Sequence, residues 1–101
     1  LEHVAIPDSV RKIERGVFWH CEKLKEVTLP KTVEKIDEYA FFHCYALKKV
    51  VLPRLTPPEM CNSFNTGTDL VIYVPKEAVE TYRSDINWQQ LHIESIESLE
   101  K

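Results

Sequence analysis

The sequence predicts a solenoid in which short parallel strands stack on one another, and two observations support this fold class. The first is a 23-residue period, kept by leucines and phenylalanines alike: Leu1, Leu24, Leu47 and Leu70, and Phe18, Phe41 and Phe64. The second is that residues 1–23 and 24–46 share nine of their 23 positions. Such a fixed period indicates units that bury their apolar edges only against their neighbours.

A period of roughly 20–29 residues is typical of leucine-rich repeats. We therefore expect a leucine-rich-repeat solenoid, with short parallel β-strands stacked into a right-handed β/α superhelix and a C-terminal helical cap. The repeats are expected over 1–75, as units 1–23, 24–46 and 47–69 and the strand of a fourth at 70–75. Residues 76–101 are expected to form the cap, because terminal repeats need one.

The opening of each unit, L-x-x-V-x-[IL]-P, predicts a short strand. Side chains alternate along a strand, so Val4 and Ile6 should face the core while His3 and Ala5 face outward. Proline has no N–H for the ladder and should end the strand at Pro7 and its equivalents. Four such strands, about 4.8 Å apart, predict a face roughly 15–20 Å wide.

The rest of each unit contains V-x-x-I and an aromatic stretch that closes on cysteine, which should return as a turn or short helical coil. The third unit is irregular at 55–58, where Leu-Thr-Pro-Pro replaces the usual loop. After Pro75, apolar residues recur at helical spacing and predict a helix over the last unit. These residues are Ala78, Val79, Tyr82 and Ile86, and Trp88 follows them.

Composition narrows the class of protein. At 101 residues we expect at most one domain, and the net charge of −3 argues against nucleic acid, which calls for a clustered basic surface. The longest apolar stretch, 70–74, is too short to span a bilayer, so no membrane insertion is expected. The chain opens directly on a repeat without a signal segment. We therefore expect an excised piece with further repeats before Leu1, or an edge that pairs with another copy.

No catalytic, cofactor or metal site is predicted. His20-Cys21 and His43-Cys44 are the strongest metal candidates, but the close ligand spacing of zinc sites is missing and the repeat itself explains the cysteines. A buried column is the expected role of Cys21 and Cys44, with a disulfide as the alternative. Cys61 lies outside that column, and the redox state of all three cysteines stays open.

Two sets of residues are candidates for recognition. The outward positions of the four strands form a candidate protein-binding face: His3, Ala5, Glu26, Thr28, Lys49, Val51, Val71 and Tyr73. Tyrosine is enriched at interface hot spots, while Glu26 opposite Lys49 is expected to be an ordinary cross-strand pair. Trp19 and Phe42, next to the phenylalanine column, are further candidates for partial exposure.

The ordered combination of proline after the strand, V-x-x-I and [AV]-F-x-x-C over residues 1–75 resembles the BspA-like leucine-rich repeat. This resemblance implies a secreted or cell-surface bacterial protein whose repeats bind a host or neighbouring-cell protein, as in adhesion. A glycan ligand is the lesser alternative. A second reading is purely structural, with the chain as the C-terminal cap and spacer of a longer array.

Overall fold

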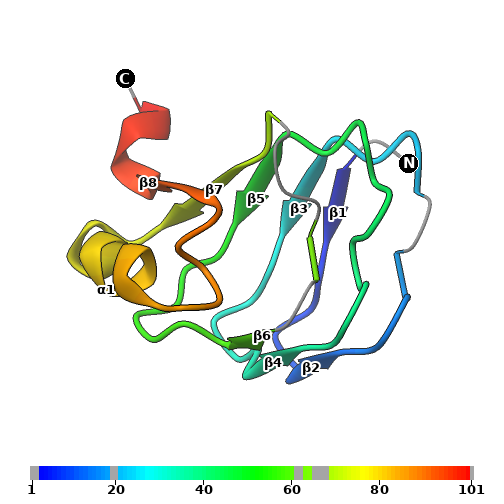
Figure 1. The fold of residues 1–101 in the computed structure, drawn as a ribbon, viewed down its shortest axis with the longest axis horizontal. Helices are drawn as coiled ribbons and strands as arrows, with labels where there is room; N and C mark the ends of the chain where they lie inside the picture. The colour runs from blue at the N-terminus through cyan, green and yellow to red at the C-terminus, as the bar shows by residue number, and fades with distance from the viewer. Residues whose placement is uncertain (1–2, 19–20, 61–62, 65–68, 101) are drawn as a thin grey trace.

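The computed structural model describes residues 3–18, 21–60, 63–64 and 69–100, and it is a solenoid of parallel strands (Figure 1). Its elements follow in this order: β1 (His3–Ala5), β2 (Lys12–Ile13), β3 (Glu26–Thr28), β4 (Lys35–Ile36), β5 (Lys49–Val51), β6 (Glu59–Met60), β7 (Val71–Val74), η1 (Lys76–Ala78), α1 (Val79–Ser84), β8 (His92–Ser95) and η2 (Ile96–Glu100).

The main sheet has five parallel strands in the order β1-β3-β5-β7-β8. Its register follows the repeat, because His3 pairs with Glu26 and Glu26 with Lys49. This confirms the expected solenoid of stacked parallel strands. The fifth strand, β8, comes from the segment 76–101 that the sequence assigned to the cap, and that division stays a prediction.

Alternation along each strand places the core residues as predicted. Val27, Val50 and Ile72 point inward and are fully buried. The prolines end the strands. One further backbone hydrogen bond forms between the last strand residue and the proline; for example, the N–H of Leu29 donates to the carbonyl of Val51 at 2.8 Å. The strand edge therefore stays paired up to the residue before each proline.

A second sheet, β2-β4-β6, lies where the sequence predicted only turns or coil (Figure 1). It directs one buried side chain per coil into the core: Ile13, Ile36 and Met60. Ile36 pairs with Met60, so the interval between these two partners is one position longer than the 23-residue period. The additional residue lies in the irregular third unit, and Phe64 is again in phase with Phe41.

The predicted phenylalanine column is confirmed. Neighbouring rings stack in parallel, with centroids 5.0 Å apart for Phe18 and Phe41 and 4.9 Å apart for Phe41 and Phe64. Phe41 and Phe64 are buried, whereas Phe18 in the first coil is only partly buried. The column therefore joins three coils through one continuous core.

The terminal helix is shorter than the sequence suggested. Ala78 and Tyr82 are buried as expected, but α1 ends at Ser84 and Ile86 is 76% exposed. Asp85 adopts an extended backbone, and its carboxylate accepts the N–H of Asn87 at 2.8 Å. This local turn ends the helix and turns Ile86 away from the core.

Candidate binding surfaces

The outward side chains of the main sheet form two columns, which we call the sheet face. One column contains His3, Glu26, Lys49 and Val71, and the other contains Ala5, Thr28, Val51 and Tyr73. The structure therefore brings together all eight residues of the candidate face. His3 and Ala5 are exposed, and the other six are partly buried by their neighbours.

An apolar patch lies at β5 and β7. Val51 pairs directly with Tyr73, and Val71 stands on the same outward side of β7. The patch is flanked on β3 and β5 by Glu26 and Lys49, whose charged atoms are 3.9 Å apart as the sequence predicted. Because both side chains are substantially exposed, this pair contributes less than about 1 kcal/mol.

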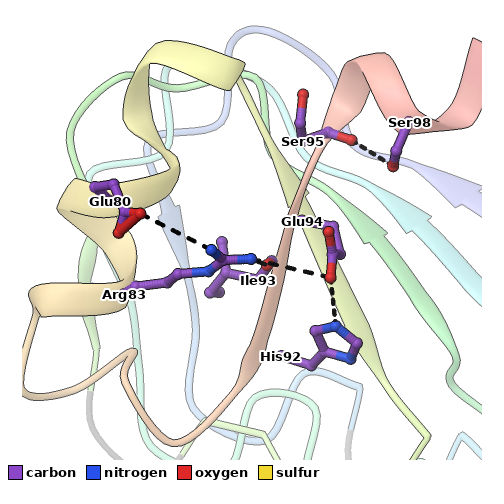
Figure 2. Close-up of polar contacts among 7 residues, drawn as sticks. All are labelled: Glu80, Arg83, His92, Ile93, Glu94, Ser95 and Ser98. Carbon is purple, nitrogen blue, oxygen red and sulfur yellow. Dashed lines mark hydrogen bonds and ion pairs between the residues drawn. The ribbon is translucent and has the colours of Figure 1, made fainter.

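The strand β8 adds two residues to the sheet face that the sequence analysis missed. His92 continues the column of Val71, and Glu94 continues that of Tyr73. The two side chains meet, since Nε2 of His92 lies 2.6 Å from Oε2 of Glu94 (Figure 2). The signal was present in the sequence, because His92-Ile93-Glu94 repeats the outward-inward-outward order of the earlier strands.

Arg83 links α1 to the terminal strand (Figure 2). Its guanidinium donates to the carbonyl of Ile93 at 2.7 Å and lies 3.9 Å from the carboxylate of Glu94. On the other side it lies 4.0 Å from Glu80. An edge strand exposes backbone groups that can template further pairing, and Arg83 occupies one of them.

Two aromatic side chains close the core at this end. Tyr82 and Trp88 are fully buried, with ring centroids 5.1 Å apart. The Tyr82 hydroxyl donates to the carbonyl of Arg54 at 2.8 Å, and the Trp88 indole donates to that of Pro58 at 3.0 Å. Burial raises the pKa of Tyr82 far above its usual range, so the hydroxyl remains a donor.

The cysteine column is confirmed for Cys44, which is buried, while Cys21 is partly buried, and both are free thiols. The Cys44 thiol donates to the carbonyl of Phe18 at 2.7 Å. Burial raises the pKa of Cys44 to about 11, which makes it a poor nucleophile at neutral pH. Cys61 lies outside the described residues.

Of the other candidate residues named from the sequence, the structure describes only some. Phe42 is partly buried, whereas Trp19 and His20 lie outside the described residues. Within the described ranges no three His, Cys, Asp or Glu side chains gather closely enough to hold a metal ion. The same residues contain no helix with the length and apolar character needed to cross a bilayer.

Comparison with known proteins agrees with the repeat pattern. The family model of the BspA type leucine rich repeat region matches the chain in six copies over residues 1–100. The matched range includes the segment that forms α1 and β8. No curated protein matches the chain.

Proposed function

We propose that this chain, which belongs to the BspA-type leucine-rich repeat family, is a module that binds a protein ligand on its sheet face. We place it in a secreted or cell-surface bacterial protein, where the ligand is a host or neighbouring-cell surface protein and the role is adhesion. The family match supports a repeat module, and repeat solenoids present extended surfaces for recognition. No catalytic role is proposed, because such repeats serve as scaffolds.

The observation that carries the proposal is the apolar patch of Val51, Val71 and Tyr73 at the centre of the sheet face. These side chains are packed on the sheet and remain partly exposed. Tyrosine in a well-packed setting is a typical hot-spot residue, and charged side chains around it match the polar rim of an interface. Here the rim is formed by Glu26 and Lys49 on one side and by His92 and Glu94 on the other.

The fifth strand strengthens this proposal. The fifth strand adds one inter-strand spacing of about 4.8 Å to the width of the face that the four predicted strands form. That brings the sheet face closer to the ~800 Å² per partner of a standard protein interface. It also places His92 and Glu94 where a ligand seated on Tyr73 would reach them.

Binding to a panel of purified secreted and cell-surface host proteins tests the proposal. We expect the double substitution Val51→Asp and Tyr73→Ala to abolish binding while the melting temperature stays near that of the parent. Ile86→Asp is the matched control, because it places the same charge on an exposed apolar residue away from the sheet face. Binding that survives in the folded double variant contradicts the assignment to this face.

A second function, the cap and spacer of a longer array, is favoured by the buried Tyr82 and Trp88 and by the cover that α1 gives to β8. The binding panel distinguishes the two functions. A folded parent that binds no member of the panel favours the cap and spacer, while binding lost only in the sheet-face variant favours recognition.

A further inference from the structure

A row of neighbouring aromatic side chains lies on the second coil after β4, away from the sheet face. We call it the aromatic strip. It contains Tyr39, Phe42, His43 and Tyr45, with successive ring centroids 5.0, 4.6 and 5.3 Å apart. Each ring meets the next edge to face, and Nδ1 of His43 is hydrogen-bonded to the Tyr45 hydroxyl. Tyr45 is 63% exposed and the other three are partly exposed.

Two residues of the strip have backbones in the left-handed region. Tyr39 has φ 59° and His43 has φ 64°. The position equivalent to Tyr39 in the first unit is Gly16, with φ 67°, so the fold requires this conformation in both coils. A residue with a Cβ is penalised there and glycine is not, and such strain is concentrated at functional sites. The aromatic ring at position 39 is therefore present despite its backbone cost.

A groove begins beside the strip. It has a volume of about 620 Å³, crosses β4 and β6, and is lined by Arg15, Glu38 and Glu59 among others. Arg15 joins the two features, because its guanidinium lies over the Tyr39 ring, 5.8 Å from the centroid. The strip and the groove therefore form one continuous surface.

The charges of the groove are unevenly paired. Asp37 is neutralised by Lys12 at 3.4 Å and by Lys35 at 3.7 Å. The carboxylates of Glu38 and Glu59, by contrast, make no ion pair with any described residue, and the same holds for the one guanidinium in the lining, that of Arg15. The lining as a whole has three carboxylates and two cationic side chains. A basic side chain on a ligand would complement the carboxylates of Glu38 and Glu59.

We propose that the aromatic strip and the groove bind an extended, proline-rich and basic segment of a partner protein, at a site separate from the sheet face. In a polyproline II helix, prolines at every third position are about 9.3 Å apart, which is about twice the spacing between neighbouring rings. Aromatic rings that line a binding surface recognise this conformation. Here the strip supplies the rings, and the groove beside it is lined by charged, polar and aliphatic side chains. The backbone carbonyls of a polyproline II helix are free to accept hydrogen bonds, and the Arg15 guanidinium can donate them.

The test is fluorescence anisotropy of the whole chain with a labelled synthetic peptide of about ten residues. The peptide has proline at every third position and arginine at the end that would enter the groove. We expect saturable binding that Tyr45→Ala and Phe42→Ala each weaken at least about tenfold. Glu38→Lys with Glu59→Lys should weaken it further and reduce its salt dependence, whereas Glu77→Lys and the sheet-face variant Tyr73→Ala should leave it unchanged.

Tyr39→Gly separates recognition from a structural role. Glycine relieves the backbone penalty, so we expect a melting temperature at or above that of the parent together with weaker peptide binding. A lower melting temperature with unchanged peptide binding would overturn the proposal. So would equal binding of a control peptide in which every proline is alanine, or no binding by the folded parent.

Discussion

The first and second coils have nearly the same apolar residues, but most of these residues differ strongly in burial, with Ile13 and Ile36 as the exception because both are buried. The partly buried set in the first coil is Val4, Ile6, Val10, Phe18 and Cys21. The equivalent set in the second coil is at most 4% exposed: Val27, Leu29, Val33, Phe41 and Cys44. The second coil has a coil on each side within the structure, whereas the first has one. Burial in this fold is therefore set by the neighbouring coils rather than by the residue types of a coil.

At the opposite end of the sheet, the core residues next to the edge strand are covered in a different way. β8 also pairs with a single strand, β7, yet its inward Ile93 is only 1% exposed. The helix α1 packs beside β8, Arg83 donates to the carbonyl of Ile93, and Trp88 is buried in the same core cluster as Ile93. The terminal segment thus takes the place of a neighbouring coil, and its removal should be the most costly change in the chain.

Replacing Trp88 with alanine should have the largest effect. The side chain is fully buried and its indole is hydrogen-bonded to Pro58, so truncation leaves a cavity and an unsatisfied carbonyl. We expect a loss of about 3–5 kcal/mol in the free energy of unfolding, which corresponds to a drop of roughly 12 °C or more in melting temperature. Urea and thermal denaturation measure both quantities.

Ile86→Ala is the control for this experiment, because Ile86 is exposed and should tolerate truncation within about 0.5 kcal/mol. An unchanged melting temperature for Trp88→Ala would show that the terminal segment does not support the array. The cap and spacer function would then lose its basis.

The contrast between coils can be measured directly on the phenylalanine column. Among the described residues, Phe41 stacks between two rings and is 1% exposed, whereas Phe18 stacks on one ring and is partly buried. Phe41→Ala should cost about 3–4 kcal/mol and Phe18→Ala about half as much, since less apolar surface returns to water.

Both variants carry the same chemical change at equivalent positions of the repeat, so each is the control of the other. Equal losses in the free energy of unfolding would contradict the comparison. They would mean that the first coil is as well buried in solution as the second.

Much of this architecture follows from the sequence, because the period fixes the register. Leucines, valines and prolines that recur once per unit place the strands, and alternation separates Val27 in the core from Glu26 on the sheet face. The outward columns could therefore be assigned for four strands. Phe41 and Phe64 could be placed in the core for the same reason.

The parts that escaped prediction depend on contacts between distant residues. β8 follows a helix and a turn, so its outward-inward-outward pattern is out of phase with the 23-residue period, and its place in the sheet is shown by its pairing with β7. The one-residue departure from the period at Met60 can be detected only from its pairing with Ile36 on β4. Likewise, the sequence shows that Tyr39 occupies the position equivalent to Gly16, but only the backbone angle φ shows that both positions adopt a left-handed conformation.

The cysteine column gives the smallest and most specific test of the comparison. Burial raises the pKa of Cys44 from 9.0 to about 11, so between these values the folded chain keeps a proton that the unfolded chain loses. The stabilisation is complete below pH 9 and is lost as the pH rises through 11. We expect the free energy of unfolding to fall by up to about 3 kcal/mol over this range, as measured by urea denaturation at several pH values.

Cys44→Ala should flatten this pH dependence. The difference between the variant and the parent gives the contribution of the thiol alone, separate from that of other groups that lose protons in the same pH range. Cys21→Ala is the matched control at the equivalent position, where the thiol is only partly buried. Alkylation at pH 8 in a Cys61→Ser background should then modify Cys21 well before Cys44. Equal rates of alkylation would mean that the second coil opens as readily as the first, against the difference in burial between them.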